Sequence, residues 1–205
     1  MNLANSISLF RIAIIPAFVI LLLNRHPHLP FLLFSFAIVT DGLDGMVARI
    51  QKQKSRLGSI LDPVADKLLL ASAYITLAIL KLVPLWLLIV IFGRDLILIL
   101  GWLKIYLATG ISRVIPTLLG KATAVFQMTL VFLVLLSSSG YLGEEKWLLI
   151  KPFILSTVVL FTVISGTEYS LRGIHVISKN TAEDKKSTLK SSRKGGGVSS
   201  ESLTE

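Results

Sequence analysis

Four aspartates are clustered between positions 41 and 66 of a chain that is otherwise strongly apolar. Asp41 and Asp44 are three residues apart, and Asp62 and Asp66 are four residues apart. On a helix, either spacing brings the two carboxylates to one side. Carboxylates crowded in apolar surroundings disfavour one another's ionisation or recruit cations. The cluster therefore indicates metal binding or acid–base chemistry.

The residues around the aspartates suit a phosphate-containing ligand. Oxygen ligands favour magnesium, manganese or calcium over zinc, and four carboxylates could hold two divalent ions that bind a diphosphate and stabilise a leaving phosphate. Gly45, Ala48 and Gly58 would let a ligand or a facing backbone approach closely. Arg49 offers a planar fork for phosphate oxygens. One or two aspartates could be solvated caps at a membrane edge, but four of them with these neighbours favour a site.

Composition predicts the kind of scaffold that must position these side chains. The chain has 205 residues, of which 53% are hydrophobic and 16% charged, and its mean hydropathy is +0.76. These values are typical of an integral membrane protein, in which a crossing helix needs roughly 20 apolar residues. We expect an all-α membrane protein with about six transmembrane helices. The apolar segments are residues 6–23, 31–49, 59–80, 84–107, 118–138 and 147–171.

Charge sets the expected orientation and the domain boundary. The net charge of +9 comes mainly from loops and tail, which favours anionic lipids over nucleic acid as partners. Residues 50–58 and 104–121 carry basic residues and no acidic ones, so both connections and both termini are expected on the cytoplasmic side. Residues 1–175 form the expected membrane domain. Residues 176–205, rich in Ser, Lys and Gly, form an expected disordered cytoplasmic tail.

The short basic connection predicts how the two acidic pairs meet. If residues 31–49 form a helix that enters from the outer side, Asp41 lies roughly 15 Å along it at 1.5 Å per residue. A connection as short as 50–58 would make this helix and the next antiparallel neighbours. The two pairs of carboxylates would then share one pocket near the cytoplasmic face. The absence of cysteine excludes disulfides and thiolate chemistry.

The motif formed by these residues resembles the signature of the CDP-alcohol phosphatidyltransferases over its full length. It reads Asp41-x2-Asp44-Gly45-x2-Ala48-Arg49-x8-Gly58-x3-Asp62-x3-Asp66. The resemblance implies an enzyme that binds CDP-diacylglycerol, lets an acceptor hydroxyl attack its β-phosphorus and releases CMP. It also implies that the four aspartates bind two Mg²⁺ or Mn²⁺ ions, that Asp66 is the general base, and that Gly45, Ala48, Arg49 and Gly58 hold the cytidine diphosphate.

Other residues bear on the acceptor. Arg94 and Asp95 lie inside an apolar stretch, where an arginine needs a partner or a wet cavity. Lys121 follows Gly120 as in relatives that use glycerol phosphate, and Arg113 is either an acceptor ligand or a membrane anchor. These four residues suggest sn-glycerol 3-phosphate as acceptor. The Asn5-x2-Ser8-x2-Arg11 segment resembles a second family feature, in which capping and phosphate contact are both open interpretations.

Alternatives to this acceptor come from the same residues. The Arg-Asp pair also resembles cardiolipin synthases of the superfamily, whose acceptor is phosphatidylglycerol. From a different class, a divalent-cation transporter would place acidic residues along a pathway, but it leaves Arg49 unexplained. The resemblance further implies the inner membrane of a bacterium, and it makes a homodimer plausible.

Overall fold

The computed structural model describes the backbone of residues 3–51, 58–109 and 118–195, and the side chains of residues 9–40, 64–101, 103, 118–169 and 171. Every element in the described backbone is a helix, which confirms the predicted all-α class. The helices are α1 (Leu3–Leu23), α2 (Leu29–Gln51), α3 (Gly58–Ile79), α4 (Leu85–Thr109), α5 (Leu118–Ser138) and α6 (Glu144–Gly195).

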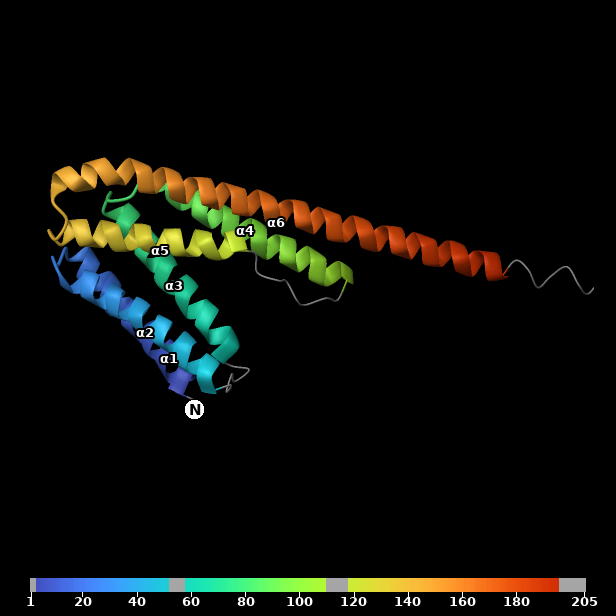
Figure 1. Ribbon diagram of the computed structural model, residues 1–205, viewed down its shortest axis with the longest axis horizontal. Coiled ribbons are helices and arrows are strands. Elements are labelled where there is room, and N and C mark those ends of the chain that lie inside the picture. The colour runs from blue at the N-terminus through green and yellow to red at the C-terminus, as the bar shows by residue number, and fades with distance from the viewer. Residues whose placement is uncertain (1–2, 52–57, 110–117, 196–205) are drawn as a thin grey trace, which may run out of the picture.

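The helices form two groups that α3 connects (Figure 1). α1 packs against both α2 and α3, and α6 packs against both α4 and α5. α3 also contacts α4 and α5, so it crosses from the first group to the second. In the described contacts both α1 and α5 touch the two helices that carry the acidic pairs, and α1 does so more extensively. The predicted meeting of those pairs involves side chains outside the described residues and stays a prediction.

Three tight turns close one end of the bundle, on the left in Figure 1. Each turn contains one residue in the left-handed region: Arg25 (φ 53°), Lys81 (φ 60°) and Gly140 (φ 77°). After Arg25 and Lys81, the next N–H donates back to the carbonyl five residues earlier, at 3.1 and 3.0 Å. This pattern satisfies carbonyls that a helix end leaves open, and it reverses the chain within a few residues.

The hydrophobic core lies close to these turns. Phe18, Phe34, Leu87 and Leu130 are fully or almost fully buried, and each sits in the half of its helix that is nearer the turns. They belong to one cluster to which all six helices contribute. Because this end is packed, it sets the angles at which the helices reach the opposite end, where α2 ends and α3 begins (Figure 1).

Buried polar side chains form hydrogen bonds between neighbouring helices within the core. The Tyr74 hydroxyl of α3 donates to the Gln127 carbonyl of α5 at 3.0 Å. The Thr123 hydroxyl of α5 lies 3.1 Å from the Phe161 carbonyl of α6. Hydrogen bonds of this kind are favoured in an apolar interior because an unmade bond costs the desolvation of the polar group.

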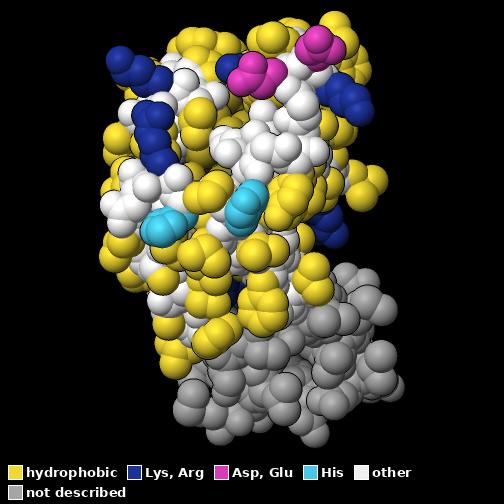
Figure 2. Space-filling model, turned by 90° about the vertical axis from the view of Figure 1, so that its left-hand side faces the viewer, with side chains coloured by type: hydrophobic (Ala, Val, Ile, Leu, Met, Phe, Trp, Pro, Cys, Tyr) yellow, Lys and Arg dark blue, Asp and Glu magenta, His cyan; other side chains and the backbone are white. Residues whose placement is uncertain are grey.

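The outside of the bundle is apolar, as a membrane requires. Leu118, Leu149 and Phe153 are 84%, 77% and 75% exposed. Figure 2, which views the end with the turns, shows hydrophobic side chains over much of the surface, with charged groups and histidines between them. Among the described residues, Leu118–Ser138 and Glu144–Tyr169 are long and apolar enough to cross a bilayer, and Leu9–Leu23 and Leu29–Thr40 are shorter apolar helices.

α6 runs through the boundary that composition predicts at residue 175. It continues as a helix to Gly195, beyond the ends of the other helices (Figure 1). The 43 residues of α6 that follow Pro152 contain no further proline. The helix ends at Gly195, the first of the three consecutive glycines Gly195, Gly196 and Gly197. Residues 176–195 are thus helical in backbone, and the separation of residues 176–205 into a disordered tail stays a prediction.

The position of the core predicts that substitutions at two leucines lower the free energy of unfolding by different amounts. Leu130→Ala should lower the free energy of unfolding by about 2–5 kcal/mol, because it leaves a cavity in the fully buried cluster. Leu149→Ala makes the same chemical change on the outer surface of α6 and should cost under about 0.5 kcal/mol. Thermal unfolding of the detergent-solubilised protein measures both. Equal losses would contradict the assigned core.

Candidate functional site

The structure places the predicted site residues on two helices and at one end of the bundle. Asp41, Asp44, Gly45, Ala48 and Arg49 lie in the last part of α2. Gly58, Asp62 and Asp66 lie in the first part of α3. Both segments are helical, as the spacing of the aspartates requires. Of these side chains only that of Asp66 is among the described ones, so the assignments of the other seven residues stay predictions.

Asp66 forms an ion pair with an arginine from a different helix. The Arg11 Nη1 of α1 donates to the Asp66 Oδ1 of α3. The Arg11 side chain is only 3% exposed, whereas that of Asp66 is 29% exposed. Arg11 therefore does not extend to the membrane surface as a snorkelling side chain. It instead pairs with the residue that the motif predicts as general base.

A second set of charged contacts begins at the residue after Asp66. The Lys67 Nζ of α3 lies 3.6 Å from the Asp95 Oδ2 of α4. The other oxygen of Asp95, Oδ1, accepts from the Arg94 Nη1 at 2.7 Å. The Arg94 Nη2 in turn donates to the Ser165 Oγ of α6 at 2.9 Å. Three helices are thus joined by a continuous series of polar contacts at the level of Asp66.

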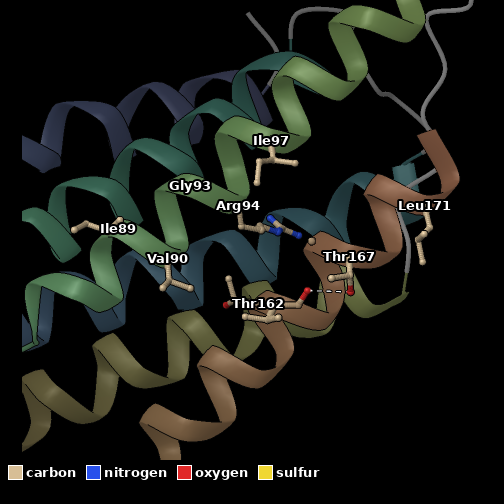
Figure 3. Close-up of a pocket in the computed structure, with 10 residues that line it drawn as sticks. Ile89, Val90, Gly93, Arg94, Ile97, Thr162, Thr167 and Leu171 are labelled. Carbon is tan, nitrogen blue, oxygen red and sulfur yellow. Dashed lines mark hydrogen bonds between the residues drawn. The ribbon is translucent and has the colours of Figure 1, made fainter. Parts of the chain in front are cut away.

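Arg94 also lines a groove between α4 and α6 (Figure 3). The groove has a volume of about 540 Å³, and its walls include Ile89, Gly93 and Ile97 from α4 and Thr162 and Gly166 from α6. A methyl group at Gly166 would lie 3.5 Å from the Arg94 side chain, so the two helices approach closely at this point. The groove combines apolar walls with one cationic side chain.

The remaining acceptor candidates are not brought to Arg94 by any described contact. Lys121 lies in the first turn of α5 and is exposed. Arg113 lies outside the described residues. The two therefore stay predictions, and the structure brings together only Arg94 and Asp95 from this set.

Sequence reasoning missed three connections. It interpreted Arg11 as a snorkelling side chain after an N-cap or as a phosphate contact, and it assigned no role to Lys67 or Ser165. Lys67 carried a signal, since a lysine directly after Asp66 in an apolar helix needs a counter-ion. Ser165 carried none, because a serine in an apolar helix commonly bonds to its own backbone.

The donor chemistry of the motif fits a hard divalent cation. No group of three or more metal-binding side chains occurs among the described residues. Three of the four candidate ligands lie outside that set, but all four are carboxylates on helical segments, and the described Asp66 side chain is 29% exposed. Carboxylate oxygens are the ligands that magnesium and manganese take.

Comparison with known proteins identifies the family. The sequence profile of the CDP-alcohol phosphatidyltransferases matches residues 1–164. The chain is 36% identical over 183 residues to the CDP-diacylglycerol–glycerol-3-phosphate 3-phosphatidyltransferase of Bacillus subtilis, covering 82% of this chain and 93% of that protein. It is 31% identical over 183 residues to a Mycobacterium tuberculosis protein named "Probable phosphatidylglycerophosphate synthase", covering 86% of this chain and 83% of that protein.

A third relative carries a different activity in its name. The cardiolipin synthase (CMP-forming) of Rattus norvegicus is 33% identical over 146 residues, which cover 63% of this chain and 48% of that protein. The chain belongs to the CDP-alcohol phosphatidyltransferase family, a family of membrane-embedded enzymes. This membership confirms the resemblance seen in the motif and decides for an enzyme over a divalent-cation transporter.

The Arg11–Asp66 contact predicts an energetic coupling between α1 and α3. Arg11→Met keeps most of the apolar stem and removes the charge, and Asp66→Asn removes the other charge. We expect the double variant to be more stable than the sum of the single losses implies, by a coupling energy of about 1–3 kcal/mol. Thermal unfolding of the four proteins of this cycle measures the coupling.

The matched control for this cycle uses an exposed arginine. Arg25 lies in the turn after α1 and is exposed. Arg25→Met and Asp66→Asn should be additive to within about 0.5 kcal/mol. If Asp66 coupled to Arg25 as strongly as to Arg11, the measured coupling energy would be unrelated to the ion pair.

Proposed function

We propose that the protein transfers a phosphatidyl group from CDP-diacylglycerol to sn-glycerol 3-phosphate, which yields phosphatidylglycerol phosphate and CMP. The family membership supports the donor and the reaction, and the two relatives from B. subtilis and M. tuberculosis support the acceptor. The observation that carries the acceptor assignment is Arg94, an almost buried cation joined by Lys67 and Asp95 to the helix of Asp66.

The proposed roles divide the site into a donor part and an acceptor part. Gly45, Ala48, Arg49 and Gly58 would bind the cytidine diphosphate of the donor. Asp41, Asp44, Asp62 and Asp66 would hold two divalent metal ions, Mg²⁺ or Mn²⁺, whose charge would polarise the diphosphate and stabilise the leaving CMP. The phosphate of the acceptor would lie against Arg94, with Lys121 and Arg113 as further basic candidates.

The proton of the acceptor hydroxyl would go to Asp66. The hydroxyl oxygen attacks the β-phosphorus, the bond from this phosphorus to the oxygen of CMP breaks, and the carboxylate of Asp66 takes the proton. Arg11 fixes one oxygen of Asp66 by its ion pair. The Asp66 side chain is 29% exposed, which leaves room for contact with an acceptor.

The membrane arrangement follows from the same residues. We propose six crossings, with the active site and both termini on the cytoplasmic side of a bacterial inner membrane. The basic connections at 50–58 and 104–121 support this orientation. It would give a water-soluble phosphorylated acceptor access to the site, while the acyl chains of the donor stay among the helices.

A second acceptor is favoured by a separate observation. The groove beside Arg94 lies between α4 and α6 and is lined mainly by apolar side chains. Phosphatidylglycerol combines a phosphate with acyl chains, so it would fit a groove with apolar walls and one arginine. The same chemistry would then yield cardiolipin, as in the named activity of the R. norvegicus relative.

Acceptor choice predicts the outcome of a CMP-release assay. The purified protein, given CDP-diacylglycerol and Mg²⁺ or Mn²⁺, should release CMP with sn-glycerol 3-phosphate, and removal of the metal by EDTA should stop the reaction. Phosphatidylglycerol offered alone should give a rate at least about tenfold lower. Turnover with phosphatidylglycerol but not with glycerol 3-phosphate would establish the second candidate. No metal-dependent CMP with either acceptor would refute the proposed reaction.

The role of Asp66 predicts a loss of turnover without a loss of donor binding. Asp66→Asn should lower kcat by about 10²-fold or more, because a positioned general base contributes on that scale. Steady-state rates and the KM for CDP-diacylglycerol measure the effect, and thermal unfolding confirms that the variant is folded. Glu145→Gln, which changes an exposed carboxylate at the start of α6, is the control and should keep full activity. Full activity of Asp66→Asn would remove Asp66 from this role.

A further inference from the structure

We propose that Asp95 is a positioning residue that holds Arg94 toward the acceptor phosphate, and that it does not itself bind the acceptor. This inference rests on the proposed function and revises the assignment of Asp95 from sequence. It depends on four described side chains, which are Lys67, Arg94, Asp95 and Ser165.

Arg94 needs a fixed counter-ion when no acceptor is bound. Its side chain is only 13% exposed, and it emerges from an apolar stretch of α4 beside Ile97 and Val90 (Figure 3). A cation in such surroundings is strongly destabilised unless a negative group pairs with it. The Asp95 Oδ1, 2.7 Å from the Arg94 Nη1, supplies that charge.

The contact with Asp95 sets the direction of the guanidinium. Neighbouring residues on a helix point about 100° apart, since a turn has 3.6 residues. Arg94 must therefore bend toward the side of α4 that carries Asp95. Ser165 of α6 accepts a hydrogen bond from the other terminal nitrogen at 2.9 Å. Two acceptors from two helices thus hold the planar group in one orientation.

Both oxygens of Asp95 are already engaged by cations. Oδ1 accepts from Arg94, and Oδ2 lies 3.6 Å from the Lys67 Nζ. An acceptor hydroxyl could reach this carboxylate only in place of one of these partners. The phosphate of an acceptor, being an anion, would instead be repelled by Asp95 and attracted by Arg94.

Arg94 retains unused donors for such an anion. Its Nε–H is buried and has no hydrogen-bond partner among the described residues. Each terminal nitrogen carries a second N–H beyond the one donated to Asp95 or to Ser165. A tetrahedral phosphate monoester has oxygens that match the planar fork of an arginine.

Lys67 connects the Arg94–Asp95 pair to the helix that carries Asp66. It directly follows Asp66, which faces Arg11 of α1, whereas Lys67 faces Asp95 of α4. The two residues thus extend from neighbouring positions of α3 to two different helices. Arg94, Asp95 and Lys67 fix where an acceptor phosphate would lie relative to Asp66. Lys67 is 56% exposed, so its pair with Asp95 is the weaker of the two contacts.

A phosphate monoester without a reactive hydroxyl separates positioning from direct contact. Asp95→Asn should raise the KM for glycerol 3-phosphate about tenfold or more, and change kcat and the KM for CDP-diacylglycerol less than about threefold. Ethyl phosphate, used as a competitive inhibitor, should lose affinity by the same factor. If Asp95 instead binds acceptor hydroxyls, the inhibition constant of ethyl phosphate will not change, and the inference is wrong.

Further variants test the individual contacts. Ser165→Ala should raise the KM for the acceptor severalfold. Lys67→Met should also raise this KM, but by a smaller factor than Asp95→Asn. Asp95→Glu keeps the charge and should recover part of the lost acceptor affinity. Glu144→Gln, an exposed carboxylate of α6, is the matched control and should leave every constant unchanged. If Asp95→Asn does not fold, the values for Ser165→Ala and Asp95→Glu decide, and wild-type acceptor and ethyl phosphate affinities in both would overturn the inference.

These measurements distinguish a failure of this inference from a failure of the proposed function. If the wild-type enzyme uses phosphatidylglycerol and not glycerol 3-phosphate, the proposed acceptor is wrong. The same KM and ethyl phosphate measurements are then made with phosphatidylglycerol. If the wild-type enzyme uses glycerol 3-phosphate and Asp95→Asn leaves both phosphate affinities unchanged, only the role of Asp95 is wrong.

Discussion

The ion pair between Arg11 and Asp66 is the constraint on which the described half of the site depends. Neither charge is stable alone in an apolar bundle, because the helices and the surrounding lipid cannot replace the water that each group loses. The pair therefore requires α1 to lie beside α3 at this level. Asp66 is held by this contact from α1, and its side chain is 29% exposed.

The packed core, at the other end of the helices, sets the helix angles that allow this contact. Phe18, Phe34 and Leu130 fill the end of the bundle that carries the tight turns. The charged residues lie farther along the same helices, toward the end where α2 finishes and α3 begins (Figure 1). Close packing tolerates little rearrangement, so the core fixes the helix angles and leaves the other end to polar chemistry.

The proposed site divides into a part that carries the family motif and a part that would select the acceptor. The motif from Asp41 to Asp66 is the proposed donor and reaction part, and the match of the family over residues 1–164 includes it. Arg94 lies on a different helix, beside an apolar groove, and is joined to α3 through Asp95 and Lys67. The chain is similar both to a protein named as a glycerol-3-phosphate phosphatidyltransferase and to one named as a cardiolipin synthase, which fits such a division.

The sequence by itself determined the class of the protein. The helical spacing of the aspartates, the long apolar segments and the full motif were enough to predict an all-helical membrane phosphatidyltransferase, because each of these signals is local along the chain. Only the tertiary structure decided the partners of Arg11, Arg94 and Asp95. Those contacts join residues from different helices, and their formation depends on packing angles set by the core, which no spacing along the sequence records.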